Sequence, residues 1–172
     1  ETAAAVVEDG KKLLSNAVLS SMDLHAAYGG VVPEIDARSH IESITPVIKQ
    51  ALSDAHCTWD DIDAIAVTYG AGLGGSLLVG VLTARTLAIT KNKPLYAINH
   101  VEGHIYANFL TETTMPGYTM RQDQPEFPML GLIVSGGHSQ LVLWRDHFDY
   151  TLLGQTHDDA IGEAFDKVAK ML

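Results

Sequence analysis

The amino-acid sequence predicts an α/β fold built on a mixed sheet. Over the first 110 residues, stretches with strand periodicity alternate with stretches with helical periodicity, which is typical of α/β proteins. After a polar stretch, a second series of three strands and a helix begins at residue 129, as a duplicated unit would. Hydrophobic residues make up 47% of the 172-residue chain and charged residues 19%, so there is ample apolar material for a core.

Each element has a local signal. Two apolar runs around a Glu-Asp-Gly turn predict a hairpin, apolar residues at helical spacing predict the helices, and further short apolar runs predict the other strands. The expected strands span 3–7, 12–19, 60–68, 95–98, 129–134, 140–144 and 150–153; the expected helices span 35–55, 77–87, 100–110 and 158–172; and 111–128 is expected to be a loop or linker. The apolar stripe expected on the first of these helices is Ile41, Ile44, Val47, Ile48, Ala51 and Leu52. The chain has no initiator Met and ends directly after an uncapped helix, so we expect that it is cut at both ends.

The amino-acid composition argues against several classes of function. The chain has 11 basic and 21 acidic residues, a net charge of -10, and an acidic surface does not attract phosphate backbones by itself. No apolar run reaches the length of a membrane span and no signal-peptide pattern is visible, so a soluble protein is expected. The single cysteine, Cys57, forms no internal disulfide and favours a reducing compartment such as the cytoplasm.

A glycine-rich loop, Gly-Ala-Gly-Leu-Gly-Gly-Ser at 70–76, lies between an expected strand and an expected helix. It satisfies the G-x-G-x-x-G pattern of dinucleotide-binding folds in the right local context. Those folds also need an acid at the end of the next strand to hold the ribose, but that strand ends in Ile98, Asn99 and His100. A tight turn packed close to a ligand is therefore favoured over a dinucleotide site.

Two histidines, His100 and His104, stand four residues apart on an expected helix. This spacing puts both imidazoles on one helix face, within reach of one metal ion. In zinc proteases of the H-E-x-x-H type, a glutamate directly follows the first histidine; here Glu102 lies one residue further along, so protease chemistry is not supported. One surface histidine and one packed histidine is the alternative interpretation.

Two further motifs lie in the second series. The Ser-Gly-Gly-His motif at 135–138 ends a strand, and its glycines let backbone N–H groups approach phosphate or carboxylate oxygens, although a hairpin turn explains it equally well. Asp159, Glu163 and Asp166 share one face of the last helix, which is most often a solvated stripe. Gly162 between them costs about 1 kcal/mol relative to alanine, which suggests a functional reason for it.

Five motifs that follow one another in this chain indicate a protein family more specifically than any single motif does. They are Tyr-Gly-Gly-Val-Val-Pro-Glu at 28–34, Gly-Leu-x-Gly at 72–75, His-Val-Glu-Gly-His at 100–104, Ser-Gly-Gly-His at 135–138 and Gly-Glu-Ala-Phe-Asp-Lys at 162–167. Together they resemble the TsaD family, the tRNA threonylcarbamoyladenosine transferases once described as O-sialoglycoprotein endopeptidases. The histidine at 138 resembles bacterial and mitochondrial members. The resemblance covers nearly the whole chain; the stretch 113–124 is longer than the family's usual connection.

The resemblance implies a fold and a reaction. The fold is the two-lobed actin, sugar-kinase and Hsp70 (ASKHA) fold, with residues 1–128 as a first lobe that lacks its first strand and contains the linker 111–128. Residues 129–172 would begin a truncated second lobe of three strands and a helix. The reaction is the transfer of threonylcarbamoyl from threonylcarbamoyl-AMP to N6 of adenosine 37 in tRNAs that read ANN codons.

The resemblance also implies site residues and partners. His100 and His104 match the two metal-binding histidines of the family, which hold one iron or zinc ion together with an aspartate from the C-terminal part. The residues that match the adenylate-contacting positions are Ile133, Val134, Ser135, Gly136, Gly137 and Asp166. The expected partners are ANN-decoding tRNA and proteins of the TsaB and TsaE type, with no membrane, in the cytoplasm or, for a eukaryotic protein, the mitochondrion. Because further ligands are missing, we expect these 172 residues alone to be inactive.

Three other classes stay open on the residues alone. A sugar kinase or ATPase of the same fold would use the glycine turns for ATP but gives no reason for the two histidines. A metalloprotease would use the histidines but not Glu102. An inactive scaffold that pairs with an active homologue gives no reason for the histidines or for the motif at 135–138.

Overall fold

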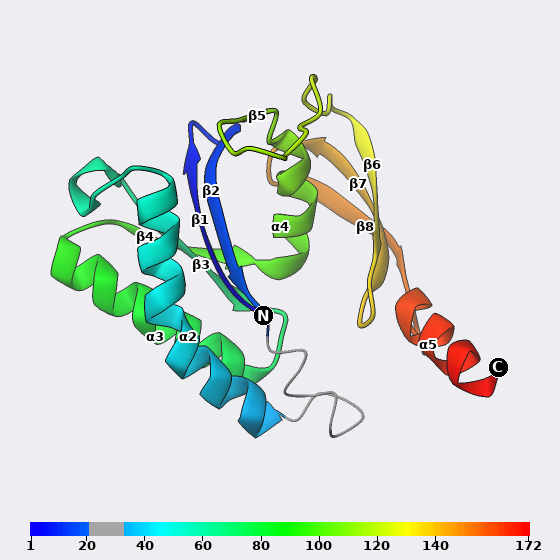
Figure 1. The fold of residues 1–172 in the computed structure, drawn as a ribbon. Helices are drawn as coiled ribbons and strands as arrows, with labels where there is room; N and C mark the ends of the chain where they lie inside the picture. Colours follow the sequence, from blue (N-terminus) through cyan, green and yellow to red (C-terminus); the bar gives the residue numbers. More distant parts are fainter. Residues whose placement is uncertain (21–32) are drawn as a thin grey trace. The chain divides into compact units, whose positions relative to one another are not determined.

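The computed structural model describes residues 1–20 and 33–172 (Figure 1). The motif residues 28–32 therefore lie outside the described residues. The contacts divide the chain into two compact units: Glu1–Gly103 with Leu110–Gln122, and His104–Phe109 with Asp123–Leu172. The chain passes from one unit to the other after Gly103, Phe109 and Gln122. The two lobes, with their boundary at residue 128, remain a prediction.

The first unit opens on the expected hairpin. Strands β1 (Thr2–Glu8) and β2 (Lys12–Leu19) pair antiparallel. The connection between them contains Asp9 and Gly10, whose φ angles of 53° and 68° are both positive. Hairpin turns with two such angles favour Asp-Gly, because glycine adopts a positive φ at no steric cost. Helix α2 (Pro33–Asp54) packs on the hairpin, where Val47 and Ala51 form a small core with Ala17.

The helical stripe expected on α2 is correct except at one end. Ile44, Val47, Ile48, Ala51 and Leu52 are buried or half-buried, whereas Ile41 is 62% exposed. Polar residues replace it on the packed face near the start of the helix, because Asp36, His40 and Ser43 are all buried there. Apolar periodicity alone does not reveal this exchange.

A βαβ unit follows. Strands β3 (Ile65–Gly70) and β4 (Leu95–Asn99) pair parallel, and helix α3 (Gly74–Lys91) connects them. The strand expected over 60–68 begins later than expected, because Trp59–Asp61 form a 3₁₀ turn, η1, instead. The Asp61 carboxylate accepts hydrogen bonds from the Thr58 backbone N–H (2.8 Å) and hydroxyl (2.9 Å), which closes that turn.

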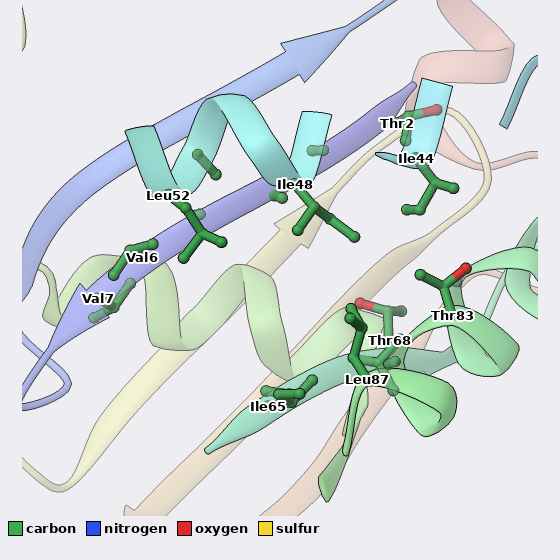
Figure 2. Close-up of a pocket in the computed structure, with 18 of the residues that line it drawn as sticks. Thr2, Val6, Val7, Ile44, Ile48, Leu52, Ile65, Thr68, Thr83 and Leu87 are labelled. Atoms are coloured by element: carbon green, nitrogen blue, oxygen red, sulfur yellow. The ribbon is translucent and has the colours of Figure 1, made fainter. Parts of the chain in front are cut away.

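A cavity of about 1470 Å³ that is open to solvent lies in the first unit, between β1 and β3 and against the helices α2 and α3 (Figure 2). The labelled side chains of Ile44, Ile48 and Leu52 point toward it from α2, and Leu87 borders it from α3. Within the described residues, β1–β2 and β3–β4 belong to separate sheets. The sheet that contains β1 and β2 is mixed, as the sequence predicts, because a short strand described below pairs parallel with β2.

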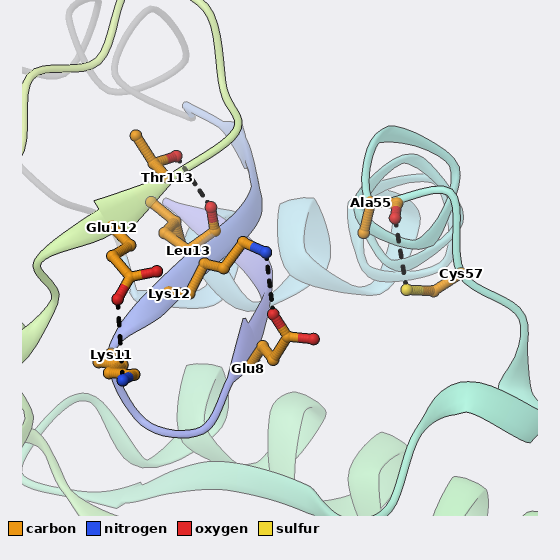
Figure 3. A network of polar contacts seen from close by, with 8 residues as sticks. All are labelled: Glu8, Lys11, Lys12, Leu13, Ala55, Cys57, Glu112 and Thr113. Atoms are coloured by element: carbon orange, nitrogen blue, oxygen red, sulfur yellow. Dashed lines mark hydrogen bonds and ion pairs between the residues drawn. The ribbon is translucent and has the colours of Figure 1, made fainter.

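The stretch 111–128, expected to be a loop, contains one short strand. β5 (Glu112–Thr113) pairs parallel with β2 (Figure 3). The Thr113 hydroxyl donates a hydrogen bond to the carbonyl of Leu13 (2.8 Å), and the Glu112 carboxylate lies 3.8 Å from the Lys11 ammonium. This pairing joins residues 100 positions apart in the chain, so a local pattern does not predict it.

The second unit contains the meander expected from residue 129. Strands β6 (Met129–Val134), β7 (Ser139–Asp146) and β8 (Asp149–Gln155) pair antiparallel, and helix α5 (Ile161–Met171) follows. The helix expected over 100–110 divides into α4 (His100–Tyr106) and a 3₁₀ turn, η2 (Ala107–Phe109). Trp144 on β7 is only 1% exposed and packs edge-on against Tyr106. None of the described helices is both long and apolar enough to cross a membrane.

Candidate functional site

The last residue of the glycine-rich loop, Ser76, contacts a buried carboxylate on α2. Ser76, in the first turn of α3, donates a hydrogen bond of 2.5 Å to Oδ2 of Asp36, which is only 8% exposed. The same oxygen lies 3.1 Å from Nε2 of His40, whose Nδ1 is 2.7 Å from the Thr2 hydroxyl. The chain Ser76–Asp36–His40–Thr2 thus ties α3, α2 and β1 together at one end of the cavity. Sequence reasoning missed it; its only local signal is an aspartate and a histidine four residues apart on α2.

The last residue of β4, Asn99, caps a helix, which argues against the dinucleotide-binding alternative. The Asn99 side-chain oxygen accepts hydrogen bonds from the backbone N–H groups of Val101 (2.8 Å) and Glu102 (3.3 Å). It thereby caps helix α4, as asparagine does at helix N-termini. The position where a dinucleotide fold places an acid for the ribose is therefore used for capping.

The two expected metal ligands lie on the capped helix. His100 begins α4 and His104 follows four residues later, and both side chains are exposed. Imidazole nitrogens suit iron and zinc, so the donor chemistry fits the expected ion but supplies only two of the three or four protein ligands that such sites use. In the part of the chain that the structure describes, no group of three or more His, Cys, Asp or Glu side chains gathers around one point.

A small pocket of about 190 Å³ in the second unit brings two predicted groups together. It is lined by His104, Ile105, Asn108, Leu132, Ile133, Val134 and Ser135. One predicted metal ligand and three predicted adenylate-contacting residues therefore border the same space. Asn108, which sequence reasoning missed, donates from its amide to the carbonyls of His104 (3.2 Å) and Ile105 (3.1 Å), and these bonds fix it at the end of α4.

The Ser-Gly-Gly-His motif forms a tight turn between β6 and β7. The Ser135 N–H donates to the His138 carbonyl (2.8 Å), and the His138 N–H donates to the Ser135 hydroxyl (2.9 Å). These bonds leave Gly136 and Gly137 exposed at the tip. Because the turn is hydrogen-bonded on itself, the hairpin interpretation is correct for the backbone, and the expected ligand contacts stay a prediction.

The start of α5 is fixed against this turn. The Gly162 N–H donates to the Ser135 carbonyl (3.2 Å), and the Ile161 N–H donates to the Ser139 hydroxyl (2.9 Å). A side chain on Gly162 would place its Cβ 2.8 Å from the Gly136 Cα and 2.9 Å from the Ser135 carbonyl oxygen. Gly162 lowers helix propensity, but a side chain at this position would collide with the backbone of the turn at 135–138.

The three acids expected on one face of the last helix do not all lie on α5, because that helix begins at Ile161 rather than at residue 158 and Asp159 precedes it. Lys167 lies 2.6 Å from Asp159 and 3.3 Å from Glu163, and the hydrogen bond with Asp159 is the largest of the interactions that raise the pKa of Lys167. Asp166 is exposed and follows Gly162 by one helical turn, so it lies on the face of α5 that begins beside the turn at 135–138.

Known proteins are similar to this chain over its whole length. A model of the TsaD family, described as tRNA N6-adenosine threonylcarbamoyltransferase, matches residues 12–172. Curated proteins of that name are 58% identical in Thermomicrobium roseum, 54% in Dehalococcoides mccartyi and 48% in Staphylococcus carnosus, each over all 172 residues. These residues cover 46%, 50% and 47% of the three relatives, so the chain spans about half the length of the curated relatives it matches. The chain belongs to the TsaD family.

Proposed function

We propose that the full-length protein transfers the threonylcarbamoyl group from threonylcarbamoyl-AMP to N6 of adenosine 37 in tRNAs that read ANN codons. Family membership along the whole chain carries this proposal. We also propose that the two compact units are parts of the two lobes of an ASKHA fold, which the mixed α/β architecture supports.

The reaction needs one bond exchange. The adenosine N6 attacks the carbamoyl carbon, an N–C bond forms, the bond from that carbon to the AMP phosphate oxygen breaks, AMP leaves, and the proton of N6 passes to solvent. Backbone N–H groups at Gly136 and Gly137 would hold the leaving phosphate, since exposed turn amides bind anions well. Asp166 would contact the same ligand from α5. No side-chain nucleophile is required.

The small pocket supports placing the donor beside His104. His104 borders the same space as Val134 and Ser135, so a ligand on the turn would lie next to an imidazole. We propose that His100 and His104 hold one iron or zinc ion, with further ligands from outside these residues. Such an ion would supply Lewis-acid polarisation of the carbamoyl carbonyl.

The negative charge of the chain suggests that the basic surface for tRNA binding comes from elsewhere. A net charge of -10 opposes tRNA phosphates, so we propose that proteins of the TsaB and TsaE type, or the remainder of the full-length protein, supply basic surface. The 172 residues alone would then bind tRNA weakly and show no turnover.

The test is nucleoside mass spectrometry of total tRNA from cells depleted of the full-length protein. We expect threonylcarbamoyladenosine to be lost, to return with the wild-type gene, and not to return with His104→Ala. A matched control is His157→Ala, because His157 is exposed in the same unit and does not line the small pocket. Unchanged nucleoside levels in depleted cells that contain no second homologue would contradict the proposal, and phosphorylated sugar as the product would favour a kinase of the same fold.

A further inference from the structure

The part of helix α4 that carries His104 is packed against the sheet β6–β8 of the second unit. His104 borders the small pocket, whereas Tyr106 does not. Residues two positions apart in an α-helix are about 200° apart around its axis, so these two side chains leave α4 on nearly opposite sides. The side of Tyr106 holds a cluster of rings in mutual contact, the aromatic cluster, which consists of Tyr106, Phe109, Phe127, Trp144, His147 and Phe148.

The Tyr106 hydroxyl is bonded to the turn that joins β7 and β8. It accepts a hydrogen bond from the Phe148 N–H (3.3 Å) and lies 3.3 Å from Nδ1 of His147. A hydroxyl has one proton and two lone pairs, so it can accept from Phe148 and donate to Nδ1 at the same time. Phe148 has a φ angle of 61°, a left-handed conformation that a phenylalanine keeps only where its surroundings hold it there. The turn is thus held in an uncommon backbone conformation in which its amide reaches the Tyr106 hydroxyl.

Ring contacts hold both Tyr106 and the turn in place. The His147 ring stacks on Tyr106, with 5.8 Å between centroids and 15° between planes, and meets Phe127 edge-on at 4.8 Å. Trp144, which is only 1% exposed, packs edge-on against the Tyr106 ring at 5.5 Å. Displacing Tyr106 from the turn therefore also separates packed rings.

The residue between His104 and Tyr106 provides a second point of contact with the sheet. Ile105 is buried, and a Cβ on Gly131 of β6 would lie only 2.8 Å from its Cδ1. The Ile105 side chain therefore occupies the space that a larger residue would need, and it packs α4 directly onto the backbone of β6. This contact sets the approach of α4 to the sheet, and the bonds of Tyr106 to the turn add a second point that fixes the rotation of the helix about its axis.

We propose that Tyr106 is a positioning residue for His104: its bonds to the β7–β8 turn fix the rotation of α4 and thereby keep the His104 imidazole at the small pocket. The link to the metal rests on the proposed function, whereas the placement of the imidazole does not. At the outer radius of a helix, about 5–6 Å, a rotation of about 20° displaces a side chain by about 2 Å. Binding sites need their groups held within about 0.5 Å, so a small rotation of α4 is enough to weaken a ligand.

Two measurements on the full-length protein test this role. Zinc affinity is measured by competition with a chelator. The place of the imidazole is measured without metal, as the NOE between the ring protons of His104 and the methyl groups of Val134, which line the same pocket.

In Tyr106→Phe we expect the NOE to weaken and zinc affinity to fall about 2- to 10-fold, which corresponds to the net worth of one hydrogen bond. This is less than the roughly 10- to 100-fold typical of groups bonded directly to a metal ligand, because Tyr106 acts through the helix. His147→Ala should have a similar effect. His147→Asn, which keeps an acceptor near the place of Nδ1, should restore most of the affinity.

The matched control is Tyr150→Phe. Tyr150 packs against the same Trp144, with 4.4 Å between centroids, but lies on β8, so the loss of its hydroxyl should leave both measurements unchanged. Unchanged values in Tyr106→Phe, or equal losses in Tyr106→Phe and Tyr150→Phe, would overturn the proposal. If the wild-type protein binds zinc no more tightly than His104→Ala, the metal site of the proposed function is wrong, and the NOE alone then decides whether Tyr106 positions His104.

Discussion

Replacing Gly162 by alanine should weaken the contact between α5 and the turn at 135–138. In an open helix this change stabilises by up to about 1 kcal/mol, because alanine has the higher helix propensity. Here the new Cβ would lie 2.8 Å from the Gly136 Cα and 2.9 Å from both the Gly136 nitrogen and the Ser135 oxygen. All three are backbone atoms, so no flexible side chain can move aside.

The magnitude follows from two opposing effects. Overpacking of this kind costs typically about 1–3 kcal/mol, and the propensity gain offsets at most about 1 kcal/mol of that. Because the new Cβ would lie under 3.0 Å from three backbone atoms, we expect a cost in the upper part of that range, about 2–3 kcal/mol. The net loss is then about 1–2 kcal/mol, which is roughly a 5- to 30-fold increase in the open fraction. The opening should also break the hydrogen bond from Gly162 to Ser135 (3.2 Å).

Hydrogen exchange measured by mass spectrometry checks this expectation. Peptides that cover 135–139 and 161–171 should exchange faster in Gly162→Ala. The control is Gly80→Ala in the middle of α3, where the new Cβ meets only a Val67 methyl at the ordinary distance of 3.7 Å; that variant should be as stable as wild type or more so. If Gly162→Ala exchanges as slowly as wild type, the close approach does not constrain this position and the reasoning is wrong.

Two further predictions concern polar contacts. Asp36→Ala should cost about 1–3 kcal/mol in urea unfolding, because it leaves the buried His40 and the half-buried Ser76 without this acceptor. Glu34→Ala, whose ion pair with Arg38 is exposed, should cost about 0.5 kcal/mol or less. Equal losses in the two variants would contradict the argument. The hydrogen bonds from the Thr58 N–H and hydroxyl lower the pKa of Asp61 below its ordinary 3.8, so the stabilisation of the η1 turn is present above that value and is lost as pH falls through the lower pKa of the folded state. A carboxyl NMR titration should show the Asp61 pKa moving back up in Thr58→Ala, and an unchanged midpoint would exclude the hydroxyl as a cause.

The ion pairs of Lys167 show what a pattern of acidic residues does not reveal. Three acids on one face of the last helix suggest either a solvated stripe or a ligand site, and the pattern does not distinguish them. The structure assigns Asp159 and Glu163 to Lys167, which leaves Asp166 as the member of the set on which the ligand prediction depends. The pairing with Asp159 spans eight residues, beyond the spacing at which helix neighbours are read from a sequence.

The elements that depend on local interactions could be predicted from the amino-acid sequence. The Asp-Gly turn selects a hairpin, helical spacing selects the packed face of α2, and the apolar run at 129–134 forms β6 with the expected bounds. The order of five short motifs indicated the family that the comparisons then showed.

Contacts between residues far apart in the chain are seen only in the folded structure. It pairs β5 with β2, joins Ser76 to Thr2 through Asp36 and His40, and places Gly162 against Gly136. It also places β1 and β3 along one cavity. Periodicity reports which face of an element is buried but not what buries it, because each of these contacts depends on how the chain closes loops of tens of residues.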